Sequence, residues 1–360
     1  MYNITGGSGK PPLLKHYMVG PEIEKTIQHN VNWAKGKEKQ PIFKFAYLML
    51  PTSCNQKCLG CFTGKDKGKL PKELNGPFYS KETLDSIISF LKEHSAETIV
   101  YGGGGELFTW NGAKKYIQHI IESGLGIVIF TNGTLLDEKT VKWLSELDVS
   151  LIISIRDINE REHNRLVGIK GYKKTMHTLN LAIKYGMQKD NRLAVEIPVT
   201  NLNQNRVLDE FIPQMRSLGV IPFVEEFIQI TTNKKEQKIC HNFKQSREFF
   251  EKARKLDRSL GFEWKNQFGQ RVIAQPMCKR PLYSFAVYPN GDVMDCPSHS
   301  VNYGNIYKNP NGIRGIIYSQ VFKDALLNFS LCACSVFYTN NVAKLSSLPS
   351  YLEVFKDEKA

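Results

Sequence analysis

Hydrophobic segments of strand length alternate with segments of helical periodicity through the middle of this sequence. The expected strands are residues 43–50, 98–101, 127–130, 149–155, 193–199 and 221–228, and the expected helices are residues 79–94, 113–122, 137–147, 172–185 and 207–218. Such alternation favours parallel strands joined by right-handed crossovers. About six β-α units therefore predict an α/β fold, either an open doubly wound sheet or a barrel.

The length of 360 residues fits a large α/β unit with an appendage, and a polar stretch at Lys234–Lys238 marks a boundary. We expect a mostly helical lead-in over residues 1–42, the α/β unit over residues 43–235 and a second unit over residues 236–360. No apolar run approaches the roughly 20 residues that span a bilayer. The first residues also lack the apolar core of a secretory signal, so the sequence predicts a cytoplasmic protein that does not enter a membrane.

The chain is basic, with 48 Lys and Arg against 35 Asp and Glu and a net charge of +13. This surplus would suit an anionic substrate, a nucleic acid or an acidic protein partner. Because no long block of Lys and Arg is present, a solvated lysine-rich surface is the simpler interpretation.

Seven of the eight cysteines fall in two groups, one early and one late in the chain. The early group is Cys54, Cys58 and Cys61, and the late group is Cys278, Cys296, Cys332 and Cys334. A reduced chain of this length does not need disulfides to stabilise its core. Clustered thiols therefore point to metal binding.

The early group has the spacing Cys-x3-Cys-x2-Cys and directly follows the first expected strand. Three thiolates on one loop can bind three irons of a cubane cluster and leave the fourth iron without a protein ligand. The alternative is a zinc site, which needs a fourth ligand. The nearest downstream candidate for that ligand is His94, at the end of an expected helix.

This cysteine spacing after a first strand resembles the radical S-adenosylmethionine (SAM) superfamily. The resemblance implies a partial (β/α)6 TIM-like barrel and a [4Fe–4S] cluster held by Cys54, Cys58 and Cys61. In that family the open iron chelates SAM, and an electron from the cluster cleaves SAM to a 5′-deoxyadenosyl radical. An aromatic residue usually precedes the last cysteine, where this chain has Gly60.

Loops after the later strands extend the resemblance to the SAM-binding elements of the family. The residues that it assigns to SAM are Gly103, Gly104, Gly105 and Glu106 of a GGE-like element, Asn132 of a TNG element, Ser154 and Arg165. The chain departs from the pattern at Leu107, where proline is usual, and at Asn164, where aspartate is usual. In a barrel, the carboxyl ends of successive strands converge on one face, where active sites are built.

The late group resembles the SPASM/twitch extension of this superfamily. The pattern is Cys278, a predicted hairpin with a Pro-Asn-Gly-Asp turn, Cys296, a Gly-Asn-Ile element, and the pair Cys332 and Cys334. Four cysteines imply one auxiliary [4Fe–4S] cluster, with both or only one of the last pair as ligands. Zinc bound by the same four thiols is the alternative. Cys240 belongs to neither group and is interpreted as a core or loop thiol.

The resemblance implies hydrogen-atom abstraction from a peptide or a small molecule, with oxidation or crosslinking assisted by the auxiliary cluster. It also implies an electron donor such as flavodoxin or ferredoxin. The lead-in of 42 residues is short for a leader-binding domain, which leaves room for a separate peptide-carrier protein. Within the family, the alternative is an epimerase in which Cys240 or Cys334 returns a hydrogen atom. Outside it, the alternative is a basic zinc protein that binds nucleic acid.

Overall fold

A nine-stranded sheet forms the centre of the computed structural model, which describes residues 21–61, 76–102, 104–189, 191–227, 239–241, 243–262, 280–297 and 301–328. The strands lie in the order β6-β5-β4-β3-β2-β1-β7-β8-β9. Their bounds are β1 Phe45–Leu48, β2 Thr98–Tyr101, β3 Gly126–Thr131, β4 Val149–Ser154, β5 Leu193–Val199, β6 Ile221–Glu226, β7 Ser284–Val287, β8 Asp292–Met294 and β9 Asn302–Asn305.

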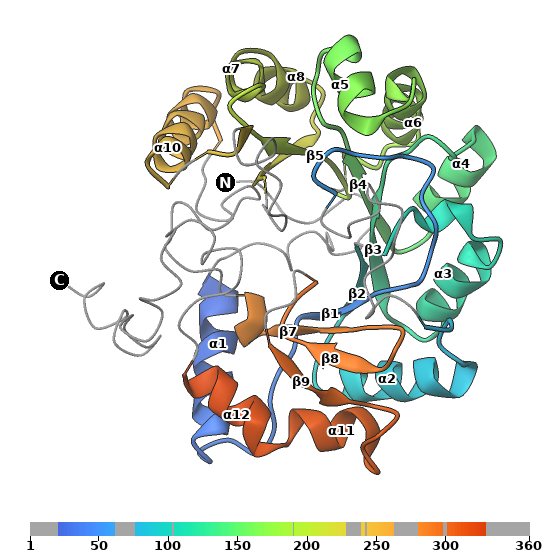
Figure 1. Ribbon diagram of the computed structural model, residues 1–360, viewed down its shortest axis with the longest axis vertical. Coiled ribbons are helices and arrows are strands. Elements are labelled where there is room, and N and C mark those ends of the chain that lie inside the picture. The colour runs from blue at the N-terminus through green and yellow to red at the C-terminus, as the bar shows by residue number, and fades with distance from the viewer. Residues whose placement is uncertain are drawn as a thin grey trace.

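Strands β1 to β6 are parallel to their neighbours and are joined by helices that lie on the outer side of the curved sheet (Figure 1). The helices of this part are α2 Lys81–Glu93, α3 Ala113–Glu122, α4 Glu138–Glu146, α5 Glu160–Val167, α6 Tyr172–Lys184, α7 Gln204–Arg206 and α8 Ile212–Ser217. The sheet does not close, because β6 and β9 form its two ends. The predicted α/β fold with a partial barrel is confirmed.

The strands of this part are buried along nearly their whole length, as expected when both faces of a parallel sheet are covered. Side chains at the N-caps of two helices accept hydrogen bonds from backbone amides of the first turn. The Ser80 hydroxyl accepts a hydrogen bond from the Thr83 amide at 3.2 Å, and the Asp137 carboxylate accepts one from the Thr140 amide at 2.8 Å. These interactions place α2 and α4 within a residue or two of their predicted bounds.

Two helical segments differ from the expectation. Helix α5 forms where only a loop was predicted after β4, with Asn159 as its N-cap and Gly168 in the left-handed region at its end (φ 72°). The helix expected over residues 207–218 begins earlier, with α7 at Gln204, and the first part of the expected span, Val207–Phe211, is a π-helical turn that leads into α8. A π-turn is an interruption of the α-helical hydrogen-bond pattern that periodicity alone does not reveal.

Strands from the C-terminal part extend the same sheet beyond β1. Strand β7 pairs in parallel with β1, and β8 and β9 then add in antiparallel orientation. The predicted hairpin is confirmed, since β7 and β8 are joined through the turn that contains Gly291 (φ 89°). Residues 234–238, where the domain boundary is expected, lie outside the described residues. The division into units at residues 42 and 235 stays a prediction.

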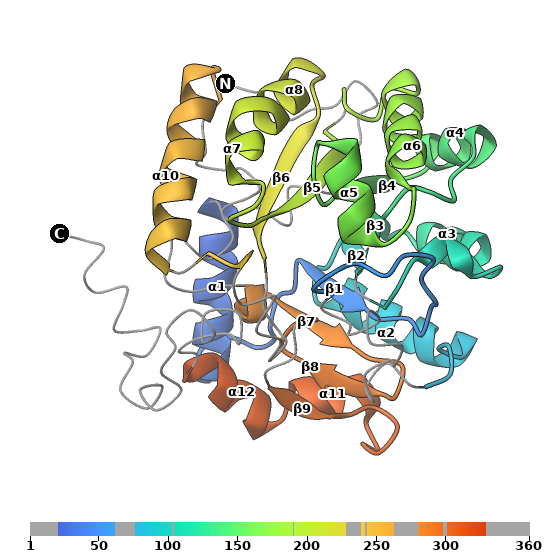
Figure 2. The same cartoon turned by 45° about the horizontal axis from the view of Figure 1, so that its top comes forward.

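Helix α1 (Pro21–Ala34) lies beside α12 (Gln320–Leu327), so the two ends of the described chain are close together (Figures 1 and 2). Asn30 is buried and donates hydrogen bonds of 2.8 Å to the carbonyls of Ile42 and Leu282. Trp33 packs edge-on against Tyr318 at a centroid distance of 5.5 Å. Helix α1 therefore packs the segment that precedes β1 against the C-terminal part of the chain.

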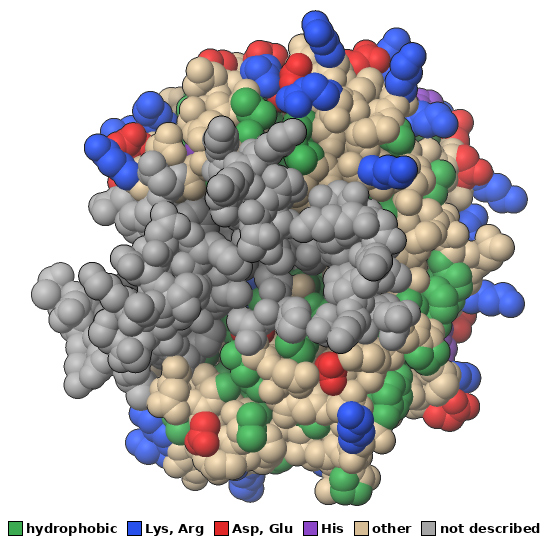
Figure 3. All heavy atoms as spheres, in the orientation of Figure 1, with side chains coloured by type: hydrophobic (Ala, Val, Ile, Leu, Met, Phe, Trp, Pro, Cys, Tyr) green, Lys and Arg blue, Asp and Glu red, His purple; other side chains and the backbone are tan. Residues whose placement is uncertain are grey.

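The remaining described helices are α10 Phe243–Ser259, which lies near α8 and β6 in Figure 2, and α11 Gly312–Ile317. Within the described part of the chain, no helix has the length and hydrophobicity needed to cross a bilayer. On the face shown in Figure 3, lysine and arginine side chains are spread over the outer helices, with acidic side chains among them. The basic surplus thus does not form one continuous patch on that face.

Candidate functional site

The polar segments singled out in the sequence follow the carboxyl ends of neighbouring parallel strands. The cysteine loop, defined here as Pro51–Cys61, follows β1, and the glycine loop follows β2. Asn132 follows β3, and Ser154 is the last residue of β4. Since the carboxyl ends of parallel strands lie at one edge of a sheet, these segments come together there. Gly103 lies outside the described residues.

One side of the cysteine loop is attached to the end of α5 by backbone hydrogen bonds. The amide of Lys57 donates to the carbonyl of Val167 at 3.0 Å, and the amide of Leu59 donates to the carbonyl of Leu166 at 2.8 Å. Within the loop, the Cys61 amide donates to the Cys58 carbonyl at 3.1 Å. Helix α5, which was not predicted from the sequence, therefore helps to position the cysteine loop.

The other side of the cysteine loop is attached to the ends of β2 and β3. The side chain of Asn132 donates to that of Asn55 at 2.9 Å, and Asn55 donates to the Thr134 hydroxyl at 2.7 Å. The Ser53 carbonyl accepts a hydrogen bond of 2.9 Å from the Glu106 amide. Asn132 thus positions the cysteine loop directly.

Gly60 allows a close approach between the cysteine loop and the segment after β6. Its φ of +68° is in the left-handed region, and an added Cβ would lie 1.9 Å from Cζ of Phe227. The ring of Phe227, which is buried, fills the space beside Gly60. This packing explains why the chain lacks an aromatic residue at position 60.

Glu106 is buried, and both of its carboxylate oxygens accept hydrogen bonds from protein donors. Oε1 accepts from the Thr131 hydroxyl at 2.8 Å and from the Phe108 amide at 3.3 Å, while Oε2 accepts from the Asn132 amide at 2.7 Å. Glu106 therefore joins the end of β2 to the end of β3. Its expected contact with the amino group of SAM stays a prediction.

The glycine loop crosses close to the end of β1. An added Cβ at Gly104 would lie 1.9 Å from the backbone oxygen of Leu50, and Gly105 has a φ of +153°. Only glycine permits this approach and this backbone conformation. The glycines therefore position Glu106 next to the cysteine loop.

Two charged residues that the sequence analysis did not single out lie beside Ser154 and Cys58. The Ser154 hydroxyl donates a short hydrogen bond to the carboxylate of Glu196, which is its register partner on β5. Arg156 lies two residues beyond Ser154, within hydrogen-bonding reach of Cys58. The register of β4 and β5 accounts for Glu196, because side chains at paired positions lie on the same face.

Burial and charge act on Cys58 in opposite directions. Burial raises the pKa of the Cys58 thiol, and Cys61 adds to the rise, whereas the Arg156 guanidinium lowers it. Burial would lower the pKa of Arg156, but Cys58, Glu196 and Cys61 raise it overall. The Cys58 thiol also donates to the Gln56 side chain at 3.3 Å. A thiolate at Cys58 would thus meet a compensating positive charge.

Arg165 lies on the exposed side of α5. Its guanidinium donates to the Glu162 carboxylate at 2.9 Å and 2.7 Å, and 53% of its side-chain surface is exposed. Its expected role in binding SAM stays a prediction. The neighbouring Asn164 accepts hydrogen bonds from the Gly171 and Tyr172 amides and so fixes the turn into α6.

Cys240 is held near the carboxyl end of β5. Its carbonyl accepts a hydrogen bond of 2.9 Å from the side chain of Asn201, and the Asn201 amide donates to the Ile239 carbonyl. The thiol is partly buried. Cys240 is therefore near the same edge of the sheet as the cysteine loop.

Of the late cysteines, only Cys296 belongs to the described residues. It is buried, follows β8 by two residues and lies close to Asp295 and Tyr303. Cys278, Cys332 and Cys334 lie outside the described residues. None of the five cysteines within the described ranges is in a disulfide.

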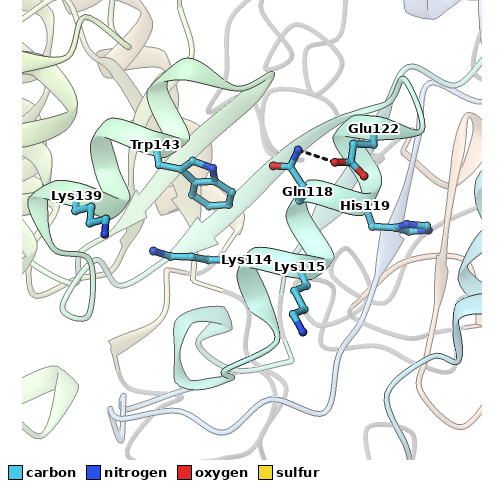
Figure 4. Close-up of a pocket in the computed structure, with 7 residues that line it drawn as sticks. All are labelled: Lys114, Lys115, Gln118, His119, Glu122, Lys139 and Trp143. Carbon is cyan, nitrogen blue, oxygen red and sulfur yellow. Dashed lines mark hydrogen bonds between the residues drawn. The ribbon is translucent and has the colours of Figure 1, made fainter.

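A groove on the outer surface between α3 and α4 is separate from these loops (Figure 4). Its lining residues are Lys114, Lys115, Gln118, His119, Glu122, Lys139 and Trp143. Lys114 lies over the Trp143 ring at 5.6 Å, and Gln118 donates to Glu122 at 2.9 Å. Neither the cysteine loop nor the glycine loop contributes to it.

Residues 49–201 match the Radical SAM superfamily, a span that contains the cysteine loop, the glycine loop, Asn132 and Ser154. This chain carries a radical SAM domain. The match covers β2 to β5 and the helices between them. It bears out the resemblance seen in the cysteine spacing for this part of the chain.

Two curated relatives are similar to part of this chain. The tungsten-containing aldehyde ferredoxin oxidoreductase cofactor-modifying protein of Pyrococcus furiosus is 27% identical over 49% of this chain and 49% of its own length. The antilisterial bacteriocin subtilosin biosynthesis protein AlbA of Bacillus subtilis is 23% identical over 55% of this chain and 42% of its own. The chain spans half or less of the length of the curated relatives it matches.

The structure of SuiB of Streptococcus suis bound to the precursor peptide SuiA has the same fold. It superposes with a TM-score of 0.62 and 13% identity, over 85% of this chain and 71% of SuiB. This likeness extends well beyond the region matched by the family.

The family match supports a SAM-binding [4Fe–4S] cluster for this domain. Within the described ranges, no group of three cysteine, histidine or carboxylate side chains is arranged to hold one metal ion. Zinc gathers its sulfurs at about 2.3 Å from one centre, whereas a cubane cluster distributes three thiolates over three irons. The expected zinc ligand His94 contacts the Phe90 carbonyl and the Tyr318 hydroxyl through its two ring nitrogens, near the opposite end of β1.

Proposed function

We propose that this radical SAM enzyme holds a SAM-binding [4Fe–4S] cluster with Cys54, Cys58 and Cys61 and abstracts a hydrogen atom from a peptide substrate. The observation that carries the proposal is the attachment of the cysteine loop to the end of β3, to the end of α5 and to the segment after β6. Asn132, the α5 carbonyls and Phe227 all contact this loop. When bound, the cluster and SAM supply a strongly oxidising carbon radical.

The residues of the chain prepare this chemistry by positioning the ligands. Asn132 and Glu106 connect the loops after β2 and β3 to each other, and Asn132 also connects them to the cysteine loop. Ser154 and Glu196 form a polar pair on the neighbouring strands. Arg156 provides a positive charge that complements the thiolates. These groups line the edge of the sheet where SAM would lie.

We assign the C-terminal part to a SPASM/twitch extension with one auxiliary [4Fe–4S] cluster. Cys296 supports this assignment, because it follows the predicted hairpin and is buried on a strand layer continuous with β1. Cys278, Cys332 and Cys334 would supply the remaining thiolates. The pairing of β7 with β1 would connect the auxiliary site to the strand that precedes the cysteine loop.

A peptide substrate is favoured over a small molecule by the relatives. One shares the fold and was solved with a precursor peptide, and another acts in the biosynthesis of a bacteriocin. The net charge of +13 would suit an acidic peptide. An electron donor of the flavodoxin or ferredoxin class, and a separate peptide carrier, belong to the same proposal.

The first test measures 5′-deoxyadenosine released from SAM by the anaerobically reconstituted protein with dithionite. We expect release by the wild type and by Cys240→Ala, which serves as the matched control, and none by Cys58→Ala. Release by Cys58→Ala would refute the role of the cysteine loop. Cys278→Ala and Cys296→Ala should lose about half of the iron but keep uncoupled cleavage, because an auxiliary cubane would be one of two.

The second test identifies the substrate class by mass spectrometry. The reduced protein is incubated with SAM in heavy water, together with either a peptide fraction or a small-molecule fraction from the same cell extract. Loss of two hydrogen atoms from a peptide supports oxidation or crosslinking. Uptake of one deuterium that is abolished in Cys240→Ala supports the epimerase alternative. A change confined to the small-molecule fraction contradicts the peptide assignment.

A further inference from the structure

The groove between α3 and α4 lies between two helices that both begin at the edge of the sheet where the cysteine loop lies. Helix α3 follows the glycine loop after β2, and α4 follows Asn132 after β3. Because strands β2, β3 and β4 are parallel, each helix runs back from the carboxyl edge of the sheet toward the amino edge. Leu135, which is 45% exposed, lies between Asn132 and the start of α4. The groove therefore leads from the site edge down the outer surface of the molecule.

The two ends of the groove differ in charge. Lys114 and Lys115 lie in the first turn of α3, and Lys139 lies in the first turn of α4. All three lysines are exposed and line the end nearest the site edge. Glu122 is the last residue of α3 and lines the opposite end. A complementary ligand is therefore negatively charged near the site edge, but not along its whole length.

The carboxylates beside the lysine end are engaged in other contacts. Asp137 caps α4 by accepting the hydrogen bond from the Thr140 amide, and Glu138 forms an ion pair of 2.6 Å with Lys184. Neither carboxylate lines the groove. The lysine end thus presents positive charge to a ligand.

Trp143 adds an aromatic surface to the lysine end. The Nζ atom of Lys114 lies 5.6 Å from the centre of the Trp143 ring, and Figure 4 shows both side chains in the space between the two helices. Of the other lining side chains, Gln118 donates to Glu122, and His119 contacts Asp85 at 2.6 Å. The lysines and Trp143 are therefore the groups placed to contact a ligand, through charge and through an apolar ring face.

This inference rests on the proposed function. We propose that the groove binds an acidic segment of the peptide substrate, outside the part of the peptide that reacts. The ammonium groups of Lys114, Lys115 and Lys139 pair with its carboxylates, and the Trp143 ring packs against an apolar side chain between them. The ten residues of α3 span about 15 Å, which about five residues of extended peptide would cover. A nucleic acid fits less well, because its phosphates would continue past Glu122.

The binding test uses the anaerobically reconstituted full chain and two fluorescein-labelled peptides. One peptide alternates glutamate with glycine around a central leucine, and the other has glutamine in place of every glutamate. Fluorescence anisotropy at low ionic strength measures the dissociation constants, because salt screens exposed charge pairs. We expect the glutamate peptide to bind at least about fivefold more tightly than the glutamine peptide.

The variant Lys114→Gln/Lys139→Gln should bind the glutamate peptide at least about fivefold more weakly than the wild type. The matched control is Lys252→Gln/Lys255→Gln, which removes the same two charges from exposed positions on α10 and should bind like the wild type. Circular dichroism establishes that both variants are folded. Both should release 5′-deoxyadenosine without substrate as the wild type does, because the groove lies outside the loops assigned to the cluster and SAM.

A competition experiment tests whether the groove serves the substrate. The glutamate peptide should slow modification of a peptide fraction from a cell extract by the wild type, and the glutamine peptide should not. Neither peptide should change the release of 5′-deoxyadenosine in the absence of substrate. Binding in the groove without such competition would overturn the inference, since the groove would then serve another partner.

Equal weakening in the groove variant and the α10 variant would also overturn the inference, because the overall charge would then explain the binding. The same holds if the wild type does not bind the glutamate peptide. Tighter binding of an oligothymidylate that is lost in the groove variant would assign the groove to nucleic acid instead. A wild type that binds the glutamate peptide in the groove but releases no 5′-deoxyadenosine would refute the proposed function and leave a site for acidic peptides.

Discussion

Replacing Glu106 by glutamine tests whether this carboxylate stabilises the junction between β2 and β3. Glutamine has the same shape but presents an amide nitrogen in place of one oxygen. Its remaining oxygen should turn to the Asn132 amide, which makes the shortest bond at 2.7 Å. The new NH2 group can then donate to the Thr131 hydroxyl, while the Phe108 amide, at 3.3 Å in the native protein, loses its acceptor.

The expected loss follows from these three bonds. Hydrogen bonds to a charged acceptor contribute about 1.5–3 kcal/mol and neutral ones about 0.5–1.5 kcal/mol, so two weakened bonds cost about 2 kcal/mol. The orphaned Phe108 amide adds up to about 1 kcal/mol. Glu106→Met leaves all three donors without this acceptor and should cost roughly 4 kcal/mol or more.

Equilibrium urea unfolding under anaerobic conditions, followed by tryptophan fluorescence and circular dichroism, measures the difference. Glu122→Gln is the control, because Glu122 is exposed and accepts only from Gln118, and it should change stability by less than about 0.5 kcal/mol. The reasoning is refuted if Glu106→Gln is as stable as this control. It is also refuted if Glu106→Met unfolds no more easily than Glu106→Gln.

Three further predictions follow from close packing, a buried histidine and a buried ion pair. Gly60→Ala should reduce both stability and iron loading, because its Cβ would overlap the Phe227 ring. The double variant Gly60→Ala/Phe227→Ala should bind more iron than the single variant Gly60→Ala. Burial, assisted by Arg156, lowers the pKa of His163 from 6.5 to about 4, so the folded state binds fewer protons than the unfolded state below pH 6.5. Urea unfolding should therefore show a loss of about 2 kcal/mol in the free energy of unfolding between pH 8 and pH 5. This loss should be absent in His163→Gln. Arg216→Met should cost about 3–5 kcal/mol by the same assay, because Asp257 would be left fully buried without its ion pair, and a loss below about 1 kcal/mol would contradict this.

The sequence predicted the strands and the cysteine loop because both depend on local patterns. Buried parallel strands appear as short hydrophobic runs, and three cysteines within eight residues are a dense local signal. Glu106 was assigned to the SAM-binding loops by resemblance, which stays a prediction, and its contacts to Thr131 and Asn132 required the structure. Local patterns therefore located the loops without revealing how they are attached to one another.

Arg156 and Glu196 could not be recognised from their neighbours in the sequence. Each is an isolated charged residue, and they come together only because Ser154 and Glu196 are paired in the register of β4 and β5. The position of β7 beside β1 was equally hidden, since about 240 residues separate them. Helix α5 was missed although Asn159, Glu162 and Gly168 are its start and end signals, because it is short and strongly polar, and only His163 and Val167 of its 8 residues are buried.

The position of β1 between β2 and β7 has a practical consequence for attempts to divide this protein. A shortened chain that ended before residue 280 would leave one side of β1 with unsatisfied backbone donors and acceptors along Phe45–Leu48. An uncovered hydrophobic strand of this kind pairs readily with strands of other molecules and promotes aggregation. The same cut would remove the Val287 partner of the Tyr79 hydroxyl, which also binds the Met49 carbonyl just ahead of the cysteine loop. The matched span of residues 49–201 lacks β1 itself and would leave β2 uncovered, so a useful fragment must retain both β1 and the C-terminal strands.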